Sequence, residues 1–133
     1  MEKDKDILEK VLDLDKLAMD SEISVYHFSS GDYLSEFYEW FKIRNRDHRL
    51  KASTGDFYEE LGDLCGRDTY RLLADKTVEF FGLPERIVRF EDGTGPKEEL
   101  EGPDGLAPFF FVFNMMFCEY KDLTLFFISG TNN

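Results

Sequence analysis

The run APFFFVFNMMFCEYKDLTLFFISG, residues 107–130, decides the fold class. Eight of its residues are aromatic, and its only charges, Glu119, Lys121 and Asp122, are clustered in the middle. Two apolar, β-prone runs separated by the polar tetrad 119–122 predict an antiparallel hairpin. The tetrad contains no Asn-Gly or Asp-Gly pair, so the turn type and the strand register stay open.

Both faces of this hairpin are apolar. Residues of odd and even number point to opposite faces of an extended strand. One face would carry Phe109, Phe111, Phe113, Met115 and Phe117, and the other Phe110, Val112, Met116 and Cys118. Such a hairpin is predicted to lie centrally in a sheet and to be covered by helices or by a partner chain.

Upstream, hydrophobic periodicity predicts a mixed order of helices and strands. Helices are expected at 5–19, at 32–44 with a cap near Asp32, after a capping box at 53–56, and from Asp68 to about Phe81. Gly66 and Gly82 are expected to end the last two helices. Strands are expected at 23–28 and 86–90, and a loop at 91–105. We therefore predict a single α+β domain over 1–133, with N-terminal helices packed on a mostly antiparallel sheet that ends in the C-terminal hairpin.

Composition limits the function classes. The 133 residues carry a formal charge of −12, which disfavours direct binding to nucleic acid or to anionic membranes and favours a basic partner. The N-terminus has no apolar signal core, and the run 106–118 is too short to span a bilayer, so a cytoplasmic protein is expected. Cys65 and Cys118 are expected to be buried thiols, with a disulfide between them left open.

Signatures of catalysis are scarce. His27 is expected to be a half-buried strand residue and His48 an exposed one; an enzyme would need His27, Tyr26 and the acidic loop at 91–105 to converge. No nucleophile elbow, zinc spacing, EF-hand loop or P-loop occurs in the chain. We expect no catalytic residues, no cofactor and no metal.

Carboxylates recur at helical spacing in three predicted helices, and two of these helices supply the candidate contact residues. Asp56, Glu59, Glu60 and Asp63 follow the pattern i, i+3, i+4, i+7, and Asp32, Glu36 and Glu39 form a second row. The Cβ atoms of carboxylates at this spacing lie about 5–6 Å apart, and their like charges destabilise the helix slightly. A rigid row of this kind can occupy a groove built for nucleic acid, although a solvated surface explains the pattern as well. The basic tract Lys42–Lys51 is expected to pair with acidic groups, within the chain or on a partner.

In size and composition the chain resembles small acidic inhibitors that block nucleases, among them anti-CRISPR, anti-restriction and immunity proteins. No motif accompanies this resemblance, so no family residues are carried over. The first hypothesis is accordingly an inhibitor that occupies the basic surface of a nuclease or another nucleic-acid-binding protein through the two acidic rows. The alternative is a homodimeric interaction or structural module that associates through the hairpin, with Phe110, Val112, Met116, Phe126 and Ile128 as contact residues.

Overall fold

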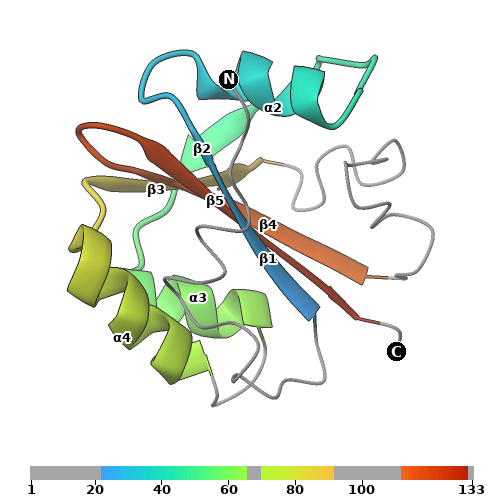
Figure 1. Cartoon of the computed structure of the whole chain (residues 1–133). Helices are drawn as coiled ribbons and strands as arrows, with labels where there is room; N and C mark the ends of the chain where they lie inside the picture. The colour runs from blue at the N-terminus through green and yellow to red at the C-terminus, as the bar shows by residue number, and fades with distance from the viewer. Residues whose placement is uncertain (1–21, 66–69, 92–111, 132–133) are drawn as a thin grey trace.

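A five-stranded antiparallel sheet of order β1-β5-β4-β3-β2 forms the centre of the molecule (Figure 1). The computed structural model describes residues 22–65, 70–91 and 112–131. The strands are β1 (Glu22–Phe28), β2 (Leu50–Ala52), β3 (Arg86–Phe90), β4 (Val112–Glu119) and β5 (Thr124–Thr131). The helices are α2 (Tyr33–Trp40), α3 (Phe57–Cys65) and α4 (Tyr70–Phe81). The predicted α+β class is confirmed.

The C-terminal hairpin is confirmed and lies inside the sheet. β4 and β5 pair from Val112↔Thr131 to Glu119↔Thr124, so the turn consists of residues 120–123. The Tyr120 N–H closes this turn by donating to the Leu123 carbonyl at 2.9 Å. β5 also pairs with β1 and β4 with β3, so neither hairpin strand is an edge.

Helices cover both faces of the sheet. Figure 1 shows α2 on one side and α3 with α4 on the other. Met115 and Phe117 pack in a core cluster with α2, whereas Met116 and Cys118 pack in a second cluster with α3 and α4. The alternation in strand β4 therefore divides its apolar residues between two cores, which explains why both faces of the hairpin are hydrophobic.

Phe37 of α2 lies at the centre of the first core. Its ring is fully buried and lies 5.0 Å from Phe126 and 5.4 Å from Phe117, centroid to centroid. Phe28 and Phe90 complete this aromatic contact from β1 and β3. Edge-to-face and tilted ring pairs of this kind add about 0.5–1.5 kcal/mol each beyond the area they bury. The amphipathic stripe of the predicted second helix is thus what docks α2 on the hairpin.

Helix α2 is shorter than predicted and ends at Trp40 rather than near residue 44. Lys42 adopts φ +58, and the Ile43 N–H turns back to donate to the Tyr38 carbonyl at 2.9 Å. This is a Schellman ending, and its usual hydrophobic contact is present because Ile43 and Tyr38 share the core cluster with α2. Burial of Ile43 ends the helix early. The predicted cap is confirmed, since Asp32 accepts from the Ser35 N–H at 3.4 Å.

The start of α3 also differs from the prediction. Asp56 is the N-cap, and its Oδ1 accepts from the Glu59 N–H at 2.8 Å. Ser53, the expected cap, lies before the helix and donates its hydroxyl to Glu60 instead. At the end of α4, Gly82 has φ +79 and donates to the Val78 carbonyl, as expected for a helix stop.

Strand β2 was not predicted. Its three residues pair with β3 from Leu50↔Phe90 to Ala52↔Val88, and nothing in Leu-Lys-Ala alternates clearly enough to identify a strand. The helix predicted at 5–19, the expected cap Asp68 and stop Gly66, and all of the predicted loop except Glu91 lie outside the described residues.

Candidate functional site

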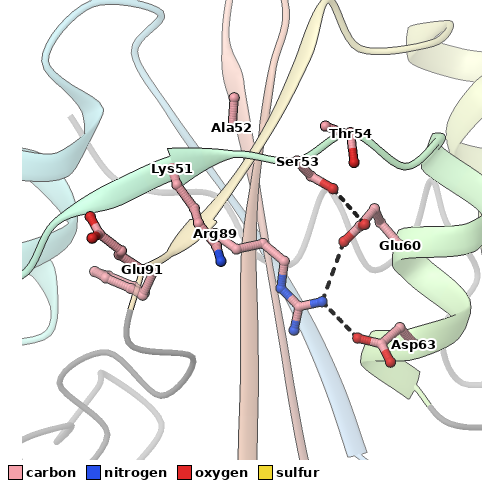
Figure 2. A pocket seen from close by; sticks show the side chains of 9 residues that line it. Lys51, Ala52, Ser53, Thr54, Glu60, Asp63, Arg89 and Glu91 are labelled. Atoms are coloured by element: carbon pink, nitrogen blue, oxygen red, sulfur yellow. Dashed lines mark hydrogen bonds and ion pairs between the residues drawn. The ribbon is translucent and has the colours of Figure 1, made fainter.

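Half of the acidic row on α3 is held by an arginine of the sheet. Arg89 Nη1 on β3 lies 2.8 Å from Asp63 Oδ2 and 3.3 Å from Glu60 Oε2. The other Glu60 oxygen, Oε1, accepts from the Ser53 hydroxyl at 2.5 Å (Figure 2). The Glu60 side chain is only 17% exposed, whereas that of Asp63 is 75% exposed. Glu60 is therefore a structural carboxylate, and Asp63 still faces solvent.

A hollow of about 460 Å³ lies beside the edge strand β2, and this network forms part of its lining (Figure 2). Lys51 and Arg89 are direct cross-strand neighbours on its floor. Like charges in that position repel each other, and the carboxylates of α3 offset the repulsion. The full lining consists of Lys51, Ala52, Ser53, Thr54, Glu60, Asp63, Arg89, Phe90 and Glu91. The hollow thus offers cations, carboxylates and hydroxyls side by side.

The remaining two residues of the α3 row are exposed. Asp56 faces solvent while it caps the helix, so its carboxylate has a structural role in addition to its charge. Glu59 is exposed, and within the described ranges its side chain makes no ion pair with Lys or Arg. Of the predicted α3 row, Asp56, Glu59 and Asp63 are accessible to a partner.

The second predicted row is separated from the first by the sheet. Asp32 caps α2, and Glu36 accepts from both the N–H and the hydroxyl of Ser29. Glu39 is exposed. Because α2 lies on one face of the sheet and α3 on the other (Figure 1), the two rows do not join into one surface.

Helix α4 carries a surface that sequence reasoning missed. Leu72, Phe80 and the following Leu83 are 56%, 55% and 64% exposed, whereas Leu73 and Ala74 are buried. Positions 72, 76 and 80 recur every four residues along one side of the helix, with exposed Asp75 and Glu79 beside them. The available signal was the excess of apolar residues in α4 beyond the stripe needed to face the sheet.

A second polar cluster ties α2 to the end of the hairpin. Glu119 accepts from Tyr33 at 2.5 Å and from Arg86 Nε and Nη2 at 3.0 and 2.8 Å. Burial by itself would raise the pKa of Glu119, but the hydrogen bonds from Arg86 and Tyr33 and the Arg86 charge outweigh it and lower that pKa. For Tyr33, burial and the bond to Glu119 raise the pKa. The cluster is a structural link between three elements.

Of the residues considered for catalysis, the described pair His27 and Tyr26 does not face one site. His27 is half-buried on β1, as predicted, but its neighbour Tyr26 points to the opposite face and is fully buried in the aromatic core. The prediction that His48 is exposed is wrong, because it is half-buried with its ring 6.0 Å from that of Phe90.

Cys118 is a buried free thiol, so the disulfide to Cys65 is not formed. The described ranges contain no group of three or more metal-binding side chains.

Three of the five residues proposed for a dimer interface are buried inside the chain. Met116 and Phe126 are fully buried, and Ile128 is 2% exposed. Phe110 and the Val112 side chain lie outside the described part. Homodimerisation stays a prediction, but these three side chains are covered by the chain's own helices.

Comparison with protein-family models, with curated proteins and with solved structures finds no significant match for this chain. Among the described helices, none is long and apolar enough to cross a membrane.

Proposed function

We propose that the protein is a small acidic inhibitor that occupies the basic, nucleic-acid-binding surface of a partner such as a nuclease, in the manner of anti-CRISPR, anti-restriction or immunity-type inhibitors. The observation that carries the proposal is the outer surface of α4, where Leu72, Phe80 and Leu83 are exposed beside Asp75 and Glu79. Exposed apolar side chains rimmed by charge are typical of protein-binding surfaces.

Helix α3 extends this acidic surface. The Tyr58 hydroxyl of α3 donates to Asp75 Oδ1 of α4 at 2.8 Å, which holds the two helices side by side. Helix α3, which carries the exposed carboxylates Asp56, Glu59 and Asp63, is therefore the element beside α4, and Asp63 lies on its side toward Arg89 of β3. We call the exposed residues Asp56, Glu59, Asp63, Leu72, Asp75, Glu79, Phe80 and Leu83 the α3–α4 surface.

The two kinds of side chain on this surface serve different steps of binding. The carboxylates, on a chain of net charge −12, attract a basic partner and increase the association rate. Apolar anchors such as Phe80 supply affinity once water is excluded, as aromatic residues do at interface centres. Complex formation should therefore be fast and salt-sensitive, with a dissociation rate that depends on Phe80 and its neighbours.

The test is affinity capture at low and moderate salt, followed by an assay of the captured protein. The expected partner is basic, is released as salt rises, and loses its nucleic-acid binding when the acidic protein is added. The variant Glu59→Lys/Glu79→Lys should lose this inhibition by at least about tenfold because each substitution replaces attraction with repulsion. Glu39→Lys on α2, on the opposite face, is the charge-matched control for each of the single substitutions Glu59→Lys and Glu79→Lys. Equal inhibition by wild type and the double variant would overturn the α3–α4 assignment.

A further inference from the structure

Strand β2 is an edge of the sheet. Two of its residues, Leu50 and Ala52, direct their backbone N–H and C=O groups away from β3. The Arg49 carbonyl accepts from the Glu91 N–H at 2.8 Å, and the Ser53 N–H donates to the Ile87 carbonyl at 2.7 Å. Alternate residues of an antiparallel strand bond to the same neighbour. Residues 49, 51 and 53 therefore bond toward β3, and Leu50 and Ala52 direct their N–H and C=O groups outward. No described strand pairs with that side.

The chain leading into this edge is the basic tract, defined as Lys42, Arg44, Arg46, Arg49 and Lys51. All five side chains are exposed. Arg46 packs its guanidinium over the Tyr38 ring, 5.6 Å from the centroid. In the described ranges no carboxylate lies within 4.0 Å of these five cations, whereas Arg86 and Arg89 are both paired. The expected internal pairing of the tract is thus not found among described residues.

The hollow beside β2 adds a place for side chains. An extended segment added to the β2 edge would turn alternate side chains toward the face that carries Lys51. That face borders the hollow, where Lys51, Ser53 and Thr54 line the side nearest the edge (Figure 2). Recognition by strand addition uses backbone bonds for affinity and such pockets for specificity.

We propose that the β2 edge binds an acidic, extended segment of a partner protein as an added antiparallel or parallel strand. The outward groups of Leu50 and Ala52 would bond its backbone, and Arg49 and Lys51 would pair with its carboxylates. A second copy of β2 is excluded as occupant because it would set Arg49 and Lys51 against the same cations. This surface adjoins the α3–α4 surface at Asp63, which also lines the hollow, but it selects the opposite charge.

The net charge of −12 repels an acidic segment, but dissolved salt limits the distance over which this repulsion acts. At about 0.15 M ionic strength the screening length is about 8 Å, so a peptide at the β2 edge responds to the basic tract and to the nearby carboxylates of the hollow. Of these, Glu60 and Asp63 are paired with Arg89. Binding should therefore be measured at that ionic strength. Salt well above it should weaken binding because the close ion pairs are then screened too.

The probe is a terminally blocked nine-residue peptide that alternates glutamate with valine, measured by fluorescence anisotropy against the full chain. Ala52→Pro removes one outward N–H and leaves the β2–β3 ladder intact, a place where proline is tolerated on an edge. Ala52→Thr keeps the N–H and is the matched control. We expect Ala52→Pro to weaken binding at least about tenfold while Ala52→Thr binds like wild type. Should Ala52→Pro fail to fold, a peptide N-methylated at alternate residues tests the reciprocal bonds on wild type, in which the peptide N–H groups donate to the outward carbonyls of Leu50 and Ala52.

Charge gives the second arm of the test. Arg49→Gln/Lys51→Gln should weaken the acidic peptide several-fold and flatten its salt dependence, and a peptide that alternates lysine with valine should not bind. The proposal would be overturned if the acidic peptide did not bind, or if the basic peptide bound as tightly as the acidic one. It would also be overturned if Ala52→Pro bound the acidic peptide as tightly as Ala52→Thr and the N-methylated peptide bound wild type as tightly as the unmethylated one. That result would mean that charge attracts the peptide without strand addition.

Discussion

Lys42 is strained by its place in the fold. Its φ of +58 lies in the left-handed region, where a residue with a Cβ is about 1–2 kcal/mol less stable than in the right-handed one. The conformation persists because it lets Ile43 return to the core and bond to Tyr38. Glycine is the usual residue at this position of a Schellman ending.

Replacing Lys42 with glycine should therefore stabilise the protein. We expect Lys42→Gly to raise the free energy of unfolding by about 0.5–1 kcal/mol, since relief of strain exceeds the added entropy of the unfolded chain. Urea unfolding measures this. Lys42→Ala loses the same charge but keeps the Cβ, so it should give no gain; equal stabilisation by both variants would attribute the effect to charge instead.

Asp56 can stabilise α3 through its capping hydrogen bond or through the negative charge of its carboxylate, and two substitutions distinguish these roles. As N-cap of α3 it accepts from the Glu59 N–H through Oδ1, and asparagine offers the same oxygen without the charge. We expect Asp56→Ala to cost about 1 kcal/mol of stability and Asp56→Asn to cost much less. Thermal unfolding distinguishes the two. Equal losses would mean that the carboxylate charge, rather than the hydrogen bond, stabilises the helix.

At the scale of elements, Glu119 connects α2 to the sheet. It receives Tyr33 from the first turn of α2 and Arg86 from the start of β3. Helix α2 is eight residues long, and isolated helices of that length are marginal in water. The docking of Phe37 into the aromatic core and this polar link together hold α2 in place.

The link predicts a pH dependence. The folded pKa of Glu119 is lowered, because the bonds from Arg86 and Tyr33 outweigh the effect of burial. Its stabilisation is therefore fully present above the unfolded glutamate pKa of about 4.3 and is lost as pH falls through the folded value. Glu119→Gln should be about 1–2 kcal/mol less stable than wild type at pH 7.

Unfolding of wild type and Glu119→Gln across pH 2 to 7 tests this sign. The difference in the free energy of unfolding between wild type and Glu119→Gln should shrink as the pH falls. Glu85→Gln, which removes an exposed carboxylate from the residue next to Arg86, controls for the loss of one negative charge. A gap that stays constant down to pH 2 would show that the substitution acts through packing or geometry instead.

Sequence patterns predicted those elements whose own hydrophobic spacing determines their structure. The hairpin, β1, β3 and the stripe of α2 carry dense apolar signals, and each is where the pattern puts it. Strand β2 was missed because pairing with β3, rather than the pattern of Leu50–Ala52, makes it a strand. The bond from Arg89 to Glu60 joins residues 29 positions apart, so no local spacing revealed that Glu60 is used internally.

The candidate surfaces were predictable to a smaller extent for the same reason. Exposed carboxylates at Glu59 and Asp63 follow from helical spacing alone. The exposure of Phe80 and Leu83 depends on how α4 lies on the sheet, and the outward groups of Ala52 depend on strand order. Neither arrangement is contained in a one-dimensional pattern.

At the scale of the whole molecule, charge opposes folding. The chain has 28 acidic and 16 basic residues, and a compact state holds the excess negative charge together. The described ion pairs, Arg86–Glu119 and Arg89 with Glu60 and Asp63, offset this only locally. Partly exposed pairs contribute up to about 1 kcal/mol each.

Added salt should accordingly stabilise the protein. Sodium chloride screens the long-range repulsion more than it weakens the close pairs, so we expect the free energy of unfolding to rise by about 1 kcal/mol between roughly 10 mM and 0.3 M. Glu59→Lys/Glu79→Lys lowers the negative charge by four and should show a smaller rise. A fall in stability with salt would mean that ion pairs dominate and that the acidic surface costs the fold little. A rise that is smaller in the double variant would show that Glu59 and Glu79 contribute to the repulsion that lowers the stability of the folded state.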